Sequence, residues 1–149
     1  MRLWHKDLIP VLPNKQLLGQ WRECCCIARN IAVNGTPNHL LVNKVMQFPY
    51  YEFCAYTSMV ATELAKRGYN IDFTKFTKYG YDAPEANATY ELGHIFAGWH
   101  NDRYLLECVI NLQEKYDCGG ITENEWRPIY RIWCMVEQKN YIERMAHHG

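Results

Sequence analysis

The chain has 149 residues, of which 48% are hydrophobic, and its 16 basic and 16 acidic residues give a formal net charge of zero. This length suits one domain with a real core, and zero net charge argues against a protein that coats nucleic acid by bulk electrostatics. Because the sequence has neither an apolar run of about 18 residues nor a signal-peptide hydrophobic region, we expect a single cytoplasmic domain over residues 1–149, with no membrane partner.

Periodic apolar residues, interrupted by Gly and Pro, first predict a helix that begins after Pro13, with Asn14 as its N-cap, and ends at Asn34-Gly35. Its inward face is expected to carry apolar residues at steps of three and four: Leu17, Leu18, Trp21, Cys25, Ile27, Ala28 and Ile31. Its more polar side is expected to carry Lys15, Gln16, Arg22 and Arg29.

The middle of the chain predicts two more helices and a long connection. Thr36-Pro37 is typical of a helix start and predicts a short helix through about Met46. A third helix is predicted from Tyr50 to Arg67, with Gly68 as its stop. Residues 69–98 show neither helical nor strand periodicity, so we expect a long, mostly irregular connection there.

The C-terminal third predicts a fourth helix, capped by Asn101 or Asp102 and closed by Gly119-Gly120. Thr122 and Glu125 then have the spacing of a capping box, but Pro128 would interrupt a helix begun there.

The last helix is therefore predicted from Pro128 to about Met145. Its inward side chains are expected to be Ile129, Ile132, Trp133, Val136 and Ile142. Because no alternating Val, Ile and Thr runs compete with these segments, the fold class is predicted to be mainly α, with about five helices in one compact domain.

Charge is unevenly distributed along the chain. Residues 1–50 carry the basic residues Arg2, Lys6, Lys15, Arg22, Arg29 and Lys44 against the acidic residues Asp7 and Glu23. If the protein has a surface that binds a polyanion, the sequence places it in this N-terminal third.

The seven cysteines are an odd number with no CxxC spacing, which argues against a disulfide scaffold and against a structural zinc site. Reduced thiols and no bound metal are expected. The run Cys24–Cys26 spans about 200° of a helix, so at least one thiol should leave the core face. A reactive thiol is one interpretation, and small buried hydrophobic residues are the preferred one.

The N-terminus has the groups that amine catalysis requires. A terminal α-amine has a pKa of about 7.7–8.0, against about 10.4 for lysine, so more of it is unprotonated at neutral pH. Such an amine, here that of Met1, can form a Schiff base with a sugar carbon if a carboxylate such as Glu23 assists. Arg2 and Arg22 offer planar donors for phosphate. The opposing interpretation is an ordinary solvated Glu-Arg pair.

Four segments occur in an order that matches a known family. They are QLLGQWRE at 16–23, the Asn34-Gly35 helix stop, ELAKRGYNI at 63–71 and the run Leu112-Gln113-Glu114-Lys115. Through them, most of the chain resembles the phage-type pyrimidine-dimer DNA glycosylases of the endonuclease V family.

This resemblance implies a mainly helical base-excision enzyme whose N-terminal amine attacks deoxyribose C1′ of a damaged nucleotide, after which β-elimination cuts the strand. It places the amine on Met1 and the essential carboxylate on Glu23. The residues that it places at or near DNA are Arg2, Arg22, Lys115, Lys15, Gln16 and, as one of several interpretations, His100. Arg29 is also expected to bind DNA, although it lies one helical turn beyond the family's next arginine, where this chain has Cys26. The implied partner is double-stranded DNA with a damaged or modified base, and no cofactor, metal or obligate protein partner is implied.

The chain departs from this family at both ends. The phage enzymes expose the amine of a small residue by removing the initiator Met, but removal is not expected ahead of Arg2, so Met1 itself must serve. The family's aromatic, lysine-rich C-terminal tail is also missing, and residues 126–149 stand in its place.

Two other classes of function remain open. A noncatalytic nucleic-acid-binding or protein-interaction module is favoured by zero net charge and a retained Met1. A metal-dependent hydrolase would use His94, His100, Asp102 and Glu91, although this histidine spacing matches no standard site. Capping, aromatic packing or a DNA contact would equally explain His100. Several aromatic side chains could stack on bases, although core packing is the preferred interpretation for them. They are Tyr50, Tyr51, Tyr79, Tyr81 and Trp99.

Overall fold

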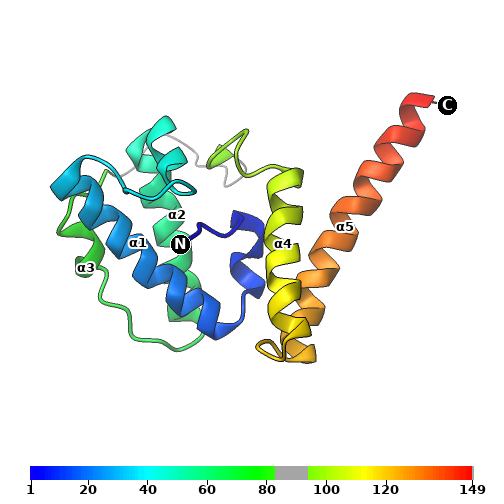
Figure 1. Ribbon diagram of the computed structural model, residues 1–149, viewed down its shortest axis with the longest axis horizontal. Helices are drawn as coiled ribbons and strands as arrows, with labels where there is room; N and C mark the ends of the chain where they lie inside the picture. The colour runs from blue at the N-terminus through cyan, green and yellow to red at the C-terminus, as the bar shows by residue number, and fades with distance from the viewer. Residues whose placement is uncertain (83–93, 149) are drawn as a thin grey trace.

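The computed structural model describes residues 1–82 and 94–148, and within these ranges it contains helices and no β-strand (Figure 1). The predicted mainly α class is therefore confirmed. The elements in chain order are the 3-10 helix η1 (Lys6–Val11), α1 (Asn14–Asn34), the 3-10 helix η2 (Asn43–Gln47), α2 (Tyr50–Lys66), α3 (Thr74–Thr77), α4 (Asp102–Asp117) and α5 (Glu123–His148).

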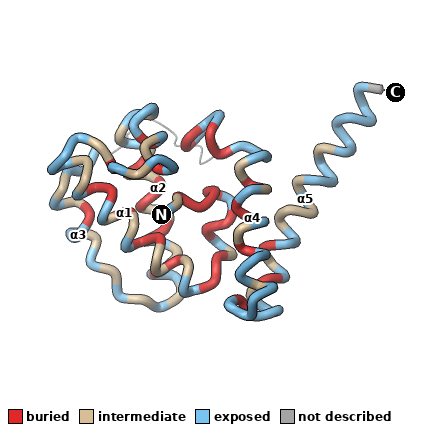
Figure 2. The backbone as a smooth tube through the Cα atoms, viewed as in Figure 1, coloured by how far each residue is buried: buried red, intermediate tan, exposed pale blue. Residues whose placement is uncertain are grey.

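The N-terminal segment lies in the middle of the molecule. In Figure 1 it runs between the α1–α2 pair and α4, and η1 contacts both α2 and α5. Figure 2 shows buried residues along this segment, whereas the second half of α5 is mostly exposed and extends away from the other helices. Within the described ranges, no helix has the length and apolar character needed to cross a membrane.

Helix α1 follows its prediction closely at the C-terminus and less closely at the N-terminus. Gly35 adopts the left-handed conformation at φ 75°, and its N–H donates to the Ile31 carbonyl at 2.9 Å. At the other end the cap residue is Pro13 and not Asn14, which is the first helical residue. The Asn14 side chain instead accepts a hydrogen bond from Arg67 at 2.9 Å.

Arg67 joins the end of α2 to the segment that precedes α1. Its guanidinium also forms an ion pair with Glu63 at 3.0 Å. Its acceptors in the preceding segment are the carbonyl oxygens of Leu12 (2.6 Å), Pro10 (3.1 Å) and Ile9 (3.5 Å). The partly buried guanidinium of Arg67 thus donates to carbonyls that the short helix η1 leaves unpaired.

Replacing this fork should destabilise the fold. Arg67→Met keeps the aliphatic stem but removes every donor, and we expect the free energy of unfolding to fall by about 1–3 kcal/mol because half-buried carbonyls lose their partners. Urea unfolding followed by circular dichroism measures the change. Lys66→Met, at the exposed neighbouring position, is the matched control and should change stability little; equal losses in the two variants would contradict the role given to Arg67.

The predicted helix from Thr36 to Met46 is wrong in extent and type. The Thr36 hydroxyl caps a turn, accepting from the Asn38 N–H at 3.2 Å, and Asn38 has a positive φ of 57° that a helix does not tolerate. The chain becomes helical at Asn43, and η2 is a 3-10 helix.

The third and fourth predicted helices are confirmed as α2 and α4. Gly68 follows α2 with a φ of 95°, and Gly119 follows α4 with a φ of 82°. Of the two caps considered for α4, Asn101 is used, since its side chain accepts from the Tyr104 N–H at 2.9 Å.

The prediction for 69–98 needs one correction, and residues 83–93 lie outside the described part of the chain. The short helix α3 occurs in this stretch, although no periodicity indicated it. Its Phe76 is fully buried and meets Phe53 of α2 edge to face at 5.5 Å between ring centroids. A single buried aromatic side chain fixes an element too short to show a period.

The last helix starts at Glu123 and not at Pro128. The capping box forms, with the Thr122 N–H donating to Glu125 at 2.9 Å and the Glu125 N–H to the Thr122 hydroxyl at 3.2 Å. Trp126 also stacks on Tyr116 of α4 at 5.3 Å. Together these contacts outweigh the one backbone bond that Pro128 removes.

The predicted inward face of this helix holds only for its first half. Ile129 is fully buried, but Ile142 is 58% exposed because the second half of α5 has no helix beside it (Figure 1).

Candidate active site

Gln20 holds the N-terminal segment against α1 and α2. Its side chain is 1% exposed. The amide nitrogen donates to the Arg2 carbonyl at 3.0 Å and to a Glu23 carboxylate oxygen at 3.4 Å. The amide oxygen accepts from the Trp4 N–H at 2.8 Å and from the Tyr56 hydroxyl at 3.1 Å. One side chain therefore fixes both the path of the first residues and the orientation of Glu23.

Glu23 lies beside the chain terminus. The Arg2 N–H donates to its carboxylate oxygen Oε2 at 3.3 Å. Three covalent bonds separate this nitrogen from the Met1 α-amine, which therefore lies within roughly 8 Å of the same oxygen. Met1 is 40% exposed and Glu23 is partly buried. The structure thus places the terminus, on an exposed residue, near a carboxylate that is 22 positions away in the sequence.

The Arg2 side chain extends toward α4. Its guanidinium lies 5.7 Å from the centre of the Trp4 ring and 3.9 Å from the Cys108 sulfur. Next to it, the Tyr104 hydroxyl donates to the Leu3 carbonyl. Burial raises the pKa of Tyr104 far above its usual range, so this hydroxyl stays protonated and remains a donor. Contacts from α4 thereby hold the N-terminal segment from the side opposite α1.

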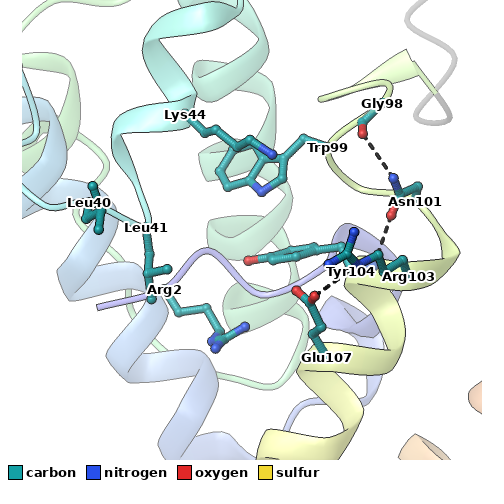
Figure 3. Close-up of a pocket in the computed structure, with 10 residues that line it drawn as sticks. All are labelled: Arg2, Leu40, Leu41, Lys44, Gly98, Trp99, Asn101, Arg103, Tyr104 and Glu107. Carbon is teal, nitrogen blue, oxygen red and sulfur yellow. Dashed lines mark hydrogen bonds and ion pairs between the residues drawn. The ribbon is translucent and has the colours of Figure 1, made fainter.

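A cavity of about 400 Å³ opens beside Arg2 (Figure 3). Trp99 and Tyr104 supply aromatic walls, with ring centroids 5.7 Å apart. Glu107 supplies a carboxylate, which pairs with Arg103 at 3.4 Å. The remaining lining residues are Leu40, Leu41, Lys44, Gly98 and Asn101. Its size and its mixture of apolar walls and a few polar groups are typical of sites for small organic groups.

The basic residues of α1 lie on its outer surface. Lys15, Arg22 and Arg29 are exposed, and Arg22 directly precedes Glu23. Gln16 is partly buried, and among the described residues its Oε1 atom has no hydrogen-bond partner. Lys115 is exposed in the last turn of α4, about 10 Å along that helix from Cys108. It therefore lies apart from the group around Arg2.

His100 lies in the core and not on the surface. It is 5% exposed, accepts from the Lys6 N–H through Nδ1 at 3.0 Å and stacks on His5 at 5.1 Å. Burial lowers the pKa of His100 far below its usual range, with a smaller contribution from His5. Among the three interpretations that the sequence left open, this environment favours aromatic packing.

The sequence also suggested a metal cluster and a reactive cysteine in the run Cys24–Cys26. Within the described ranges, no cluster of three His, Cys, Asp or Glu side chains is arranged to hold a metal ion, and Glu91 lies outside these ranges. In the cysteine run, Cys24 is buried, Cys25 is intermediate and Cys26 is exposed. Burial raises the pKa of Cys25 to about 11, which disfavours its reactive thiolate form.

The aromatic residues considered for base stacking include both buried and exposed side chains. Trp99 is 5% exposed and packs among other aromatic side chains, whereas Tyr81 is 46% exposed. Core packing therefore accounts for Trp99, although one side of its ring lines the cavity.

The sequence did not identify Gln20, Tyr56 and Tyr104 as supports of the site. A signal existed for Gln20, because it is a long polar residue at a position between Leu17 and Cys24 on the apolar face of α1. A polar side chain in such a place is kept only if it is hydrogen-bonded. No comparable signal marked the tyrosines, whose partners lie 52 and 101 residues away.

Comparison with known proteins identifies a family for the chain. The family model described as pyrimidine dimer DNA glycosylase matches residues 1–77, which include the N-terminal segment, α1 and α2. No curated protein and no solved structure matches the chain. The matched part contains Met1, Arg2, Gln20 and Glu23, but neither the walls of the cavity on α4 nor α5.

Proposed function

Because the chain belongs to the pyrimidine dimer DNA glycosylase family, we propose that it removes a damaged base from double-stranded DNA and then cuts the strand as an AP lyase. The observation that carries this proposal is the 3.3 Å hydrogen bond between the Arg2 N–H and Glu23, which keeps a carboxylate next to the chain terminus. The proposed nucleophile is the α-amine of Met1.

The proposed reaction begins when the unprotonated amine attacks deoxyribose C1′ of the damaged nucleotide. A C1′–N bond forms, the glycosidic bond breaks, and the base leaves with its electron pair and takes up a proton. Opening of the sugar ring gives an iminium ion. Glu23 stabilises this cation and transfers protons, among them the C2′ proton lost as the 3′ phosphate leaves by β-elimination. Water then hydrolyses the Schiff base and restores the amine.

The cavity beside Arg2 is suited to hold a nucleotide turned out of the duplex. Enzymes that act on a base inside DNA must move a nucleotide out of the stack, and they hold it between aromatic and apolar groups. Trp99, Tyr104 and Leu41 supply such groups, and Glu107 can accept hydrogen bonds from a base. Arg2 lies between this cavity and Glu23, where its guanidinium can bind the adjoining phosphate.

The DNA backbone is proposed to follow the surface on either side of this centre. Arg22, Lys15 and Arg29 are exposed along α1, and Lys115 is exposed on α4. Gln16 supplies a partly buried amide in the first turn of α1.

Borohydride trapping on abasic-site DNA tests the amine mechanism. We expect a covalent adduct whose proteolytic peptide carries the sugar on the α-amine of Met1, as identified by mass spectrometry. A version with extra residues ahead of Met1 moves the amine away from Glu23 and should trap at least 100-fold more slowly, since proximity to the carboxylate is lost. An adduct on a lysine, or equal trapping by the extended version, would overturn the role of the amine.

The same experiment decides between this activity and a noncatalytic nucleic-acid-binding module. Binding to DNA that weakens with salt, without any adduct on abasic, dimer-containing or modified-base DNA, would select the noncatalytic alternative.

A further inference from the structure

A second groove, of about 490 Å³, lies between α1 and α3. Four cationic side chains line it: Arg22 and Arg29 of α1, Lys75 of α3 and Lys78 at the C-cap of α3. None of the described residues that line it is acidic. In a chain with zero net charge, a groove with four positive charges is a strong local departure from neutrality.

We propose that this groove binds the sugar-phosphate backbone of the DNA strand next to the lesion, with Lys75 and Lys78 as phosphate contacts, an inference that rests on the proposed DNA substrate. The family match ends at residue 77, so it does not include Lys78. Neither lysine lies on α1, the helix on which the sequence predicted DNA contacts at Lys15, Arg22 and Arg29.

The spacing of the cations fits a run of phosphates. Arg22 and Arg29 are seven residues apart on α1, which corresponds to about 10 Å along the helix axis. One strand of DNA carries a phosphate for every 3.4 Å or so of duplex axis, so this length covers about three phosphates. Because Arg22 is next to Glu23, the track begins at the candidate active site and leads away from it.

The fold directs the two lysines of α3 into the groove. Phe76 is fully buried and anchors the short helix, and Lys75 and Lys78, three positions apart, are both exposed. The ammonium nitrogen of Lys78 lies 5.1 Å from the centre of the Tyr79 ring, which positions it without neutralising its charge. Both lysines line the groove together with Cys25 of α1, so they lie across the groove from that helix.

The carboxylate of Asp72 is engaged in hydrogen bonds within its own turn. Asp72, just before α3, accepts hydrogen bonds from the Thr74 hydroxyl at 2.5 Å and from the Thr74 N–H at 3.1 Å. These bonds are the main reason that the pKa of Asp72 is lowered, and Lys75 and Lys78 contribute less. With no ion pair to either lysine among the described contacts, both ammonium groups remain available to phosphate.

Two exposed thiols in the same chain provide a direct test. Cys26 lines the groove between Arg22 and Arg29, whereas Cys118 lies after the far end of α4. We expect a 20-base-pair abasic duplex to slow alkylation of Cys26 by iodoacetamide at least fivefold and to leave Cys118 unchanged, as read by peptide mass spectrometry. Equal rates at Cys26 with and without bound DNA would overturn the proposal.

The salt dependence of binding tests the two lysines. In Lys75→Gln/Lys78→Gln, the slope of log K against log salt concentration should become less steep by about 1.8, because two phosphate contacts are lost. Affinity near 0.15 M salt should fall on the order of 10-fold. The control Lys66→Gln/Lys139→Gln removes the same charge at exposed sites on α2 and α5 and should keep the wild-type slope. An unchanged slope in the groove variant would overturn the proposal.

Borohydride trapping of wild type in the same samples separates the two proposals. Trapping without protection of Cys26 rejects the groove and keeps the amine mechanism. Protection and a reduced slope without trapping support the groove and reject the amine mechanism.

Discussion

Glu23→Gln should bind abasic-site DNA nearly as well as wild type and cut it at least 100-fold more slowly. The amide keeps the size of the side chain and an oxygen that can accept from the Arg2 N–H, so the N-terminal segment keeps its position. It has no charge to stabilise an iminium ion, and it cannot carry a proton. General acid–base groups contribute about 10²–10⁴-fold to rates, which sets the size of the expected loss.

Single-turnover cleavage and fluorescence anisotropy measure the two halves of this prediction. Glu114→Gln, at an exposed position on α4, removes the same charge and should cut at the wild-type rate. If Glu23→Gln retains cleavage within threefold of wild type, the carboxylate has no catalytic role. If it loses binding and cleavage together, Glu23 acts by holding the N-terminal segment in place.

Gln20→Met should lower the free energy of unfolding by about 2–5 kcal/mol and reduce cleavage as well. The thioether is close in size to the amide but cannot replace its hydrogen bonds to Arg2, Trp4 and Glu23. The Trp4 N–H and the Arg2 carbonyl would lose their buried partner, and each unsatisfied group costs about 1–3 kcal/mol. Tyr56 would keep its bond to the Trp4 carbonyl at 2.5 Å, which limits the loss.

The same helix provides the matched control. Gln16→Met makes the same substitution one turn earlier, at a partly buried side chain whose Oε1 has no partner among the described residues, and it should change stability by less than about 1 kcal/mol. Urea unfolding of the two variants gives the comparison. A loss below 1 kcal/mol in Gln20→Met would show that the amide network is not needed to hold the N-terminus.

The sequence predicted well what depends on neighbouring residues. The ends of α1, α2 and α4 were identifiable because Gly35, Gly68 and Gly119 adopt the left-handed conformation that stops a helix. Predictions were wrong where two local signals competed. Thr36-Pro37 looked like a helix start but forms a turn, and Pro128 looked like a start but lies inside α5.

What could not be predicted depends on contacts between distant parts of the chain. The short helix α3 exists because Phe76 packs on α2, and periodicity over four residues cannot reveal that. The pairing of the terminus with Glu23 was expected from resemblance to a family, and the supports on Tyr56 and Tyr104 had no local signal. For the same reason, the lysines that line the groove with α1 were not identified beforehand.

The hydrogen bonds of residues 2–4 also determine when the site can form during synthesis. Trp4 needs a partner 16 residues later and another 52 residues later, and Leu3 needs one 101 residues later. Contacts this distant in sequence form slowly, and on the ribosome they must wait until the later segment has emerged. Residues 2–4 therefore complete their contacts only after α4 has been made, and a chain that stops before α4 lacks the hydrogen bond from Tyr104 to the Leu3 carbonyl.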